Sequence, residues 1–218
     1  RQCKLALENS GHICLSVYSS GGFRQLGNAT KPVHVPNDMK GLKWRTTKSP
    51  IEFMLVKNWG ATPTPYDWSQ LYSGLQSGVV EGQYVASPWQ HVAKLHEVAK
   101  YFTEIGGMWS GNILAMDAKQ YNALSSQEKK WLHKAADAYG EKVNQLDNAW
   151  IKNGEDAIKA SVKEWYVPSD AEMTKWRAGA IGAWVKAKGT FEPEVAKRVL
   201  LEQGMDGFVA QLEKAGAL

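Results

Sequence analysis

Residues 41–83 read GLKWRTTKSPIEFMLVKNWGATPTPYDWSQLYSGLQSGVVEGQ, and this stretch decides the fold. It opens with a short run at 42–46 that has the character of a strand. A helix start follows at once, because Ser49 is a good N-cap, Pro50 suits the first helical position and Glu52 completes a Ser-x-x-Glu capping box. The stretch therefore predicts a strand that leads directly into a helix.

A second helix and two more strands follow within the same stretch. Residues 60–65 favour an extended backbone, because a residue that precedes proline avoids the helical region. Asp67 is an N-cap for a helix at 68–77, and Gly78 ends that helix. Residues 79–83 read as a short strand. The order strand, helix, strand, helix, strand predicts a compact α/β lobe with parallel pairing.

Arg45 stands at the end of the first strand, just before the first helix. The free N–H groups and partial positive charge at a helix start attract anions. A guanidinium beside them is a chemically sensible receptor for a carboxylate. A lone arginine at such a place is more often an exposed surface residue, so the interpretation of Arg45 as a ligand clamp depends on the rest of the stretch.

Several runs, in this order along the chain, resemble one protein family. MKGLKWR (39–45), GATPTPYDWSQLYSGLQSGVVEGQ (60–83) and EVAKYFTEIG (97–106) are similar to the solute receptors of tripartite ATP-independent periplasmic (TRAP) transporters, of the dicarboxylate-receptor type. GFRQLGNATKPVHVPNDMKGLK (22–43) and LSSQEKKWLHKAADA (124–138) fit the same family. The resemblance covers almost the whole chain from about Gly21 onward.

The resemblance implies a two-lobed α/β architecture of the periplasmic-binding-protein type, with hinge crossovers and one long helix that spans both lobes. We expect residues 1–22 and 107–147 to form a partial lobe one, and residues 23–106 and 148–218 to form lobe two. Family members begin with a lobe-one strand that supplies part of the ligand site, and we expect this chain to lack it. An exposed sheet edge and an uncovered apolar face would then favour self-association.

The resemblance also implies a ligand site. An arginine at the place of Arg45 is the family's main carboxylate clamp, and one at the place of Arg24 lies near the ligand at the lobe crossover. Where the family commonly has an Asn-Pro step, this chain has Val85 and Ala86, which favours an apolar ligand body. Aromatic residues near the motifs, Trp44 and Trp89 among them, suggest an aromatic or branched organic acid. The candidate ligand-binding residues are Arg45, Arg24, Trp68, Tyr84, Val85, Trp109 and Asn112.

The remainder of the chain gives local signals for further elements. Ser125 and Glu128 form a capping box, and helical signals continue from there to about residue 159 with apolar residues at 3-4 spacing. Such a helix would be roughly 50 Å long and could underlie both lobes. We expect strands at 13–18, 101–105, 109–116 and 163–168, hinge-like breaks at 19–22 and 106–107, and helices at 88–100, 171–188, 193–203 and 206–214.

The two cysteines leave two interpretations open. Cys3 and Cys14 could form a disulfide in an oxidising compartment, or they could be two buried thiols. Cys14 lies in the apolar run 13–17, where a small buried hydrophobic residue is the default. We therefore expect two free thiols.

Composition excludes several classes of function. The chain has 218 residues, 44% hydrophobic residues and a net charge of +4 with no basic block, so a nucleic-acid partner is not indicated. No run approaches the ~18 apolar residues of a membrane span, and we expect no signal peptide within the sequence. The chain starts at Arg1, which we interpret as a processed or truncated product. The scattered histidines lack metal-ligand spacing, and we expect no cofactor.

Together these features predict a non-enzymatic periplasmic receptor that binds a small organic acid and delivers it to the membrane components of a TRAP transporter. Two alternatives remain open. An enzyme on a similar scaffold that acts on a small acid would need an acid–base pair in the cleft, for example Glu81 with His91, and no motif of a nucleophile or phosphate loop is present. The other alternative is a sensory or scaffolding module that binds a protein.

Overall fold

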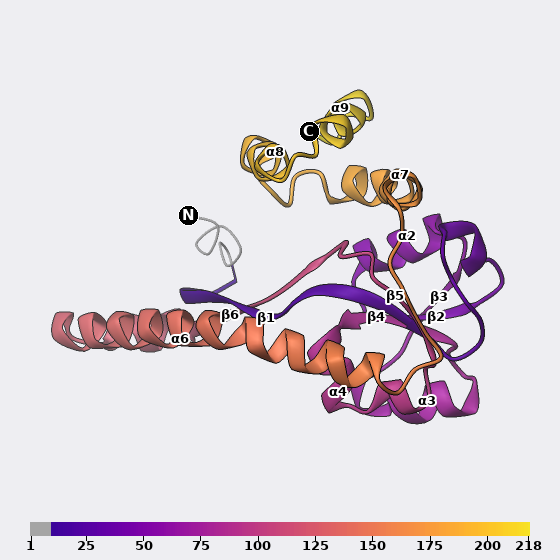
Figure 1. The fold of residues 1–218 in the computed structure, drawn as a ribbon. Helices are drawn as coiled ribbons and strands as arrows, with labels where there is room; N and C mark the ends of the chain where they lie inside the picture. The colour runs from indigo at the N-terminus through magenta and orange to yellow at the C-terminus, as the bar shows by residue number, and fades with distance from the viewer. Residues whose placement is uncertain (1–9) are drawn as a thin grey trace.

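The computed structural model describes residues 10–218, within which seven strands form one sheet. The strand order is β3-β2-β4-β1-β5-β7, and β6 pairs with β1. The long strand β1 (His12–Asn28) joins the two parts of this sheet, because its first part pairs with β6 (Trp109–Asp117) and its last part with β4 and β5. In Figure 1, β1 and β6 extend together, away from the other strands and along α6. The fold is therefore mixed α/β, as the sequence predicts.

The stretch that decides the fold forms the outer half of the sheet. β2 (Lys43–Thr46) pairs in parallel with β3 (Thr62–Pro65) and with β4 (Gly82–Ala86). α2 (Pro50–Asn58) connects β2 to β3, and α3 (Leu71–Ser77) leads towards β4. The predicted order and the parallel pairing are confirmed, although the last strand begins three residues later than predicted because its register is set by pairing with β1.

Local signals explain where these helices begin and end. The Ser49 hydroxyl accepts a hydrogen bond from the backbone N–H of Glu52, so the predicted cap of α2 is confirmed. Ahead of α3, Asp67 precedes the short 3-10 turn η2 (Trp68–Gln70) but makes no side-chain cap bond. Gly78 ends α3 in the left-handed conformation, with φ 74°.

The main core lies between this half of the sheet, α2 and α7 (Asp170–Ala187). Trp59 of the α2 C-terminus packs edge-on against Tyr84 and Trp176, with ring centroids 5.5 and 5.1 Å apart. The Trp59 indole N–H also donates to the backbone carbonyl of Trp176 at 3.1 Å. α7 is thereby fixed on α2, and the core holds the strands that carry Arg24 and Arg45.

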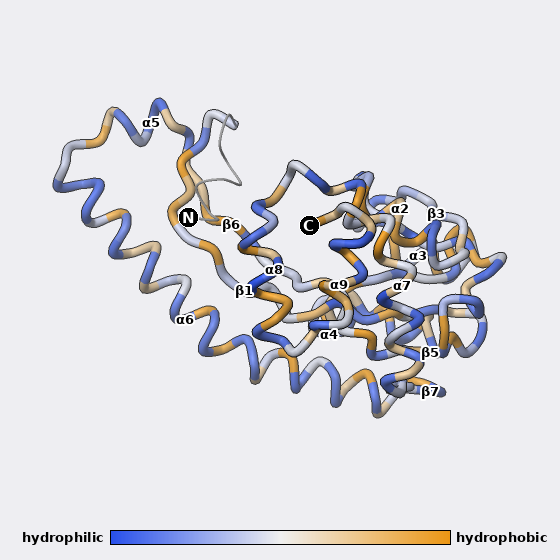
Figure 2. The backbone as a smooth tube through the Cα atoms, turned by 90° about the horizontal axis from the view of Figure 1, so that it is seen from above, coloured by the Kyte–Doolittle hydropathy of each residue, from blue (hydrophilic) through white to orange (hydrophobic). Residues whose placement is uncertain are grey.

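The helix α6 (Ser126–Lys159) has 34 residues and is roughly 50 Å long. Its predicted capping box between Ser125 and Glu128 is confirmed. Two glycines allow its backbone to approach its neighbours: a Cβ on Gly140 would lie 2.5 Å from the Ser16 hydroxyl, and one on Gly154 would lie 2.8 Å from the Pro88 backbone. Figures 1 and 2 show β1 and β6 lying beside the first half of this helix.

The C-terminal helices form a separate layer on the other side of α7. α8 (Pro193–Glu202) and α9 (Asp206–Lys214) bury a small core of their own with Trp184 of α7. Figure 1 shows both helices lying beyond α7, away from the sheet. The remaining elements are η1 (Pro36–Met39), α4 (Ser87–Val92), η3 (Leu95–Glu97), β5 (Tyr101–Thr103), α5 (Ala118–Ala123) and β7 (Glu164–Tyr166).

Two local predictions are wrong, and a third is confirmed only in part. At the break expected at 19–22, β1 continues as one strand, but its pairing with β6 is interrupted between Ser19 and Phe23, and Gly21 and Gly22 adopt positive φ values of 90° and 70°. The helix expected at 88–100 ends at Val92, and Lys94 then adopts a left-handed conformation with φ 56°. Cys14 is disulfide-bonded, so the expectation of two free thiols is wrong. Cys3 lies outside the described residues.

The predicted packing face of α6 is only partly buried. Ala136 is buried, but Tyr139 and Leu146 are exposed over about half of their surface. Tyr139 contacts Tyr18 of β1 edge-on, with ring centroids 5.2 Å apart. Within residues 10–218, no helix is long and apolar enough to cross a membrane. The division into lobes at residues 22, 106 and 147 stays a prediction.

Candidate functional site

Arg45 lies at the carboxyl end of β2, where the sheet meets the N-terminus of α2. The residue is only 6% exposed. Its Nε–H donates to the backbone carbonyl of Tyr66 at 3.0 Å, and its guanidinium carbon lies 5.9 Å from the ring centroid of Trp68. Among the described residues, none forms a hydrogen bond or an ion pair with the two terminal nitrogens of Arg45. The protein thus fixes the side chain through Nε and leaves its two-pronged end without a partner.

A buried carboxylate, Glu52, lies in the first turn of α2 beside this arginine. Its Oε2 accepts from the backbone N–H of Thr47 at 2.9 Å and also from the Thr47 hydroxyl. Its Oε1 lies 3.5 Å from Nη1 of Arg24 and has no hydrogen-bond partner. Arg24, on β1, is a quarter exposed at its side chain. The structure therefore brings Arg24 and Arg45 close together. The negative charge of Glu52 acts on both of them.

Electrostatics link these groups. Burial lowers the pKa of Arg45 from its ordinary value, because desolvation disfavours the charged form. The positive charge of Arg24 acts in the same direction, whereas the carboxylates of Glu52 and Asp67 oppose it. Arginine remains protonated in proteins. Arg45 is therefore a cation held in a poorly solvated position, where an incoming carboxylate gains most from pairing with it.

Three of the other candidate residues lie close to the arginines along the sheet. Trp68 is 40% exposed beside the Arg45 guanidinium and can cover a bound molecule. Val85 is nearly buried on β4, opposite Gln25 of β1. Tyr84 is fully buried in the main core, with its hydroxyl next to the backbone of Gly107. Burial raises the pKa of Tyr84 well above its ordinary range, so this residue is a neutral support beneath the site.

Trp109 and Asn112 lie on β6, on the other side of β1. Trp109 is 47% exposed and is the cross-strand partner of Phe23, the residue before Arg24. Asn112 is paired with Tyr18 and donates its side-chain N–H to the Ser20 hydroxyl at 3.1 Å. At about 3.4 Å per residue, Asn112 stands roughly 10 Å farther along β6 than Trp109. Asn112 is thus separated from the arginines, whereas Trp109 adjoins them.

The two aromatic residues expected around the cleft differ in their positions. Trp44 is fully buried in the main core on β2 and presents no surface to a ligand. Trp89 is partly exposed, and its indole N–H donates to both the backbone carbonyl and the hydroxyl of Ser20 at 3.1 Å. Ser20 thus receives hydrogen bonds from Trp89 of α4 and Asn112 of β6. It ties these two elements to β1 next to the site.

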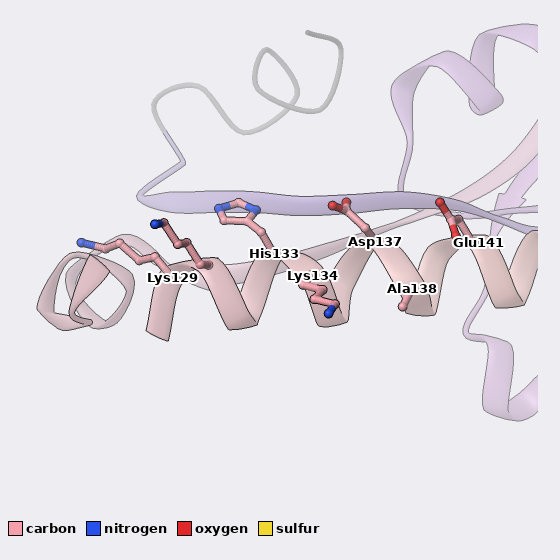
Figure 3. Close-up of a pocket in the computed structure, with 7 residues that line it drawn as sticks. Lys129, His133, Lys134, Asp137, Ala138 and Glu141 are labelled. Atoms are coloured by element: carbon pink, nitrogen blue, oxygen red, sulfur yellow. The ribbon is translucent and has the colours of Figure 1, made fainter. Parts of the chain in front are cut away.

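Two hollows are lined by other residues. An apolar groove of about 560 Å³ lies between the β5–β6 connection and helices α2, α7, α8 and α9, with Phe23 and Trp109 at its edge. Figure 3 shows the second hollow, along the polar face of α6, where Lys129, His133 and Asp137 point away from the helix. Neither hollow is lined by Arg24, Arg45 or Glu52. The arginines and Glu52 therefore lie outside both of these hollows.

The acid–base pair that an enzyme would need is not formed by the residues suggested for it. Glu81 accepts from the backbone N–H of Lys43 at 2.9 Å and from the Thr30 hydroxyl at 3.4 Å. His91 instead packs against His96, with ring centroids 5.2 Å apart. Within residues 10–218, no group of three or more His, Cys, Asp or Glu side chains could hold a metal ion.

Sequence reasoning missed the part that Glu52 plays in the site. The Ser-x-x-Glu pattern assigns Glu52 to the capping of α2, but its carboxylate bonds Thr47 and faces Arg24 instead. Arg24 lies far upstream in sequence, so no local pattern could reveal this pair. The Tyr66 carbonyl that fixes Arg45 was equally invisible, because a backbone acceptor has no sequence signature.

Comparisons with known proteins place the chain in a family. Residues 1–189 match the DctP family, bacterial extracellular solute-binding protein, family 7. The chain is 32% identical over 150 residues to the ectoine-binding periplasmic protein TeaA of Halomonas elongata, a match that covers 69% of this chain and 43% of the relative. It is 29% identical over 143 residues to the 2,3-diketo-L-gulonate-binding periplasmic protein YiaO of Escherichia coli, covering 66% of this chain and 43% of the relative.

A solved structure shares the fold. A TRAP periplasmic solute-binding protein from Shewanella oneidensis, with bound succinate, superposes with a TM-score of 0.80 at 20% identity, covering 94% of this chain and 64% of that one. The chain spans about two-fifths of the length of the two curated relatives. Because the family match extends over most of its residues, the chain belongs to the DctP family of bacterial extracellular solute-binding proteins.

Proposed function

We propose that the protein is the receptor of a TRAP-type transporter, which binds a small organic acid by its carboxylate and delivers it to the transporter's membrane components. The observation that carries this proposal is the nearly buried Arg45 guanidinium, which is fixed through Nε and has no partner among residues 10–218 at its two terminal nitrogens. A carboxylate matches that two-pronged end through two parallel hydrogen bonds. The receptor has no catalytic step.

The relatives support an acidic ligand. Two of them are named for binding ectoine and 2,3-diketo-L-gulonate, and the Shewanella oneidensis structure holds succinate. Membership of a family of extracellular solute-binding proteins supports a location outside the cytoplasm, and we place this protein in the periplasm. The ligand would reach the transporter after the lobes close about hinges near residues 20–24 and 105–109.

The candidate residues take different parts in this proposal. Arg45 binds the carboxylate, Trp68 covers the ligand body and Arg24 lies beside the bound group. Val85 and Trp109 offer apolar contacts at the margins, and Asn112 offers an amide farther along β6. Tyr84 supports the site from within the core. Because Trp68 is exposed beside the clamp and Val85 stands where an amide is common, we propose that the ligand body is aromatic or branched.

Calorimetry with Arg45 variants tests the clamp. A thermal-shift screen of mono- and dicarboxylic acids, aromatic ones included, first identifies a ligand. We expect Arg45→Ala to weaken binding of that ligand about tenfold to a hundredfold or more, and Arg45→Lys to restore only part, because an ammonium cannot make the two parallel bonds. Arg198→Ala is the matched control, since Arg198 is exposed and far along the chain on α8. Unchanged affinity in both Arg45 variants would refute the assignment.

We also propose that the protein self-associates through a row of exposed apolar side chains on β1 and β6. Val17 and Ile113 are direct cross-strand partners, and so are Phe23 and Trp109. All four are exposed over more than a third of their surface. Ser16 faces α6 at Gly140, so Val17, the next residue, points away from the helix. Exposed apolar rows of this kind favour association.

A further inference from the structure

Glu52 is a buried carboxylate that is only half satisfied. The residue is 2% exposed, and its Oε2 is bonded twice to Thr47, which fixes the carboxylate relative to the chain that leaves β2. Its Oε1 has no hydrogen-bond partner and lies 3.5 Å from Nη1 of Arg24. Buried polar atoms are almost always hydrogen-bonded, so an oxygen left facing a guanidinium calls for an explanation.

We propose that Glu52 sets the charge of the ligand, because it neutralises Arg24 and thereby makes the receptor selective for monocarboxylates over dicarboxylates. The inference rests on the proposed function, since it concerns which acid the Arg45 clamp accepts. Capping of α2 does not account for the side chain. The Ser49 hydroxyl accepts a hydrogen bond from the backbone N–H of Glu52, whereas the Glu52 carboxylate accepts hydrogen bonds from Thr47.

The balance of charge at the site favours one carboxylate. Arg24 and Arg45 carry two positive charges and Glu52 carries one negative charge, and these three are the groups shielded from water to a large extent. Asp67 is the other acidic group that acts on Arg45, but its side chain is exposed and water screens it. The shielded set thus has a net charge of +1. A single ligand carboxylate neutralises it.

Neither of the two arginines at the site would be free for a second ligand carboxylate. Arg24 is already paired with Glu52, and a diacid would place an unpaired negative charge in a poorly solvated region that contains the Glu52 carboxylate. Like charges at close range and the loss of water both disfavour that arrangement. Thr47 prevents Glu52 from turning away, because it holds Oε2 through two hydrogen bonds. The repulsion therefore lowers the affinity for the diacid.

The test compares matched acids that differ in one group. Succinate is paired with succinamate, and terephthalate with 4-carbamoylbenzoate, so that an amide replaces one carboxylate at nearly constant shape. Affinities are measured by calorimetry on the whole chain at neutral pH and low salt. We expect the wild type to bind the amide member of at least one pair at least tenfold more tightly than the diacid. We expect Glu52→Gln, which removes the charge and keeps the shape, to reduce this ratio at least tenfold.

Asp67→Asn is the matched control, because it removes an acidic charge that also acts on Arg45 but is exposed. The preference of this variant for the amide member should stay within threefold of the wild-type ratio. Thermal melting of each variant shows whether it is folded. If Glu52→Gln does not fold, the wild-type preference for the amide member over the diacid decides by itself whether the inference stands.

Two results would overturn the inference. The wild type could prefer the diacid, or Glu52→Gln could leave the ratio unchanged, for example by weakening both members equally, as the loss of a purely structural residue would. In each of these cases the chain still binds acids, so the proposed function stands. If the wild type binds no member of the two pairs and no acid from the screen, the proposed function fails, and this inference fails with it.

Discussion

The two ends of β1 have opposite surroundings. From Arg24 to Asn28 the strand is largely buried, because it pairs with β4 on one side, its last residues pair with β5 on the other, and the core beneath α2 and α7 covers it. From His12 to Ser19 it pairs only with β6, and one of its faces rests on α6 while the other is exposed. Both ends belong to one strand, yet only the buried end carries a charged site.

The difference shows what a buried charge requires. Arg24 and Arg45 can be held in place with little water because strands on both sides and aromatic residues below fix the backbone around them. A charge at the exposed end would be fully solvated and would bind an anion weakly. The buried end of β1 is thus the part that can build a specific receptor, and the exposed end is available for contacts with other molecules.

The largest expected effect compares one apolar residue from each end. Leu26→Ala should lower the free energy of unfolding by about 3 kcal/mol, because Leu26 is fully buried and its removal leaves a cavity. Val17→Ala should lower it by less than about 1 kcal/mol, because Val17 is exposed. Urea denaturation followed by circular dichroism measures both. Equal losses would mean that the two ends are packed alike, and the comparison would fail.

A smaller effect concerns association at the exposed end. Ile113→Glu should weaken self-association about tenfold, because it places a charge in the middle of the apolar row on β1 and β6. Leu146→Glu is the control, since Leu146 is more exposed than Ile113 but lies on α6, outside the row. Sedimentation velocity over a range of concentrations distinguishes the two variants. A wild-type chain that is monomeric at every concentration would exclude the proposed association.

The smallest effect is a pH dependence at the start of α6, beneath the exposed end. Hydrogen bonds from the Ser125 hydroxyl and backbone lower the pKa of Glu128 below its ordinary value of 4.5. The lowered pKa means that the capping box stabilises the helix above pH 4.5 and that this contribution is lost as the pH falls through the lowered pKa. Hydrogen-exchange protection of the first turn should therefore decrease on acidification. In Glu128→Gln this decrease should be absent or clearly smaller.

Much of the fold could be predicted because its signals are local. Ser49 and Pro50 place the start of α2, Gly78 the end of α3, and Ser125 the start of α6. These residues act through the backbone of their own segment, so the sequence around them is sufficient. The parallel pairing of β2, β3 and β4 followed from their alternation with helices.

The failures concern features that depend on distant parts of the chain. Gly21 and Gly22 predict a break, but β1 continues as one strand through them and only its pairing with β6 is interrupted. The register of β4 depends on β1, so the strand begins at Gly82 instead of residue 79. Tyr84 packs against Trp59, and Glu52 faces Arg24. Each partner lies far away in the sequence, so neither contact could be predicted from the neighbouring residues. Within the candidate site, the sequence indicated Arg24 and Arg45, but it did not indicate that the fold pairs Arg24 with Glu52.

The two glycines of α6 have a consequence for how the protein can vary in length. Gly140 lies against Ser16 and Gly154 against Pro88, so the helix touches β1 and α4 at two points about four turns apart on nearly the same face. Inserting or deleting a single residue between them would rotate one contact by about 100° relative to the other and drive a bulkier neighbour into β1 or α4. Natural variants of this receptor should therefore accommodate insertions in the loops that flank α6 and keep the spacing between the two glycines constant.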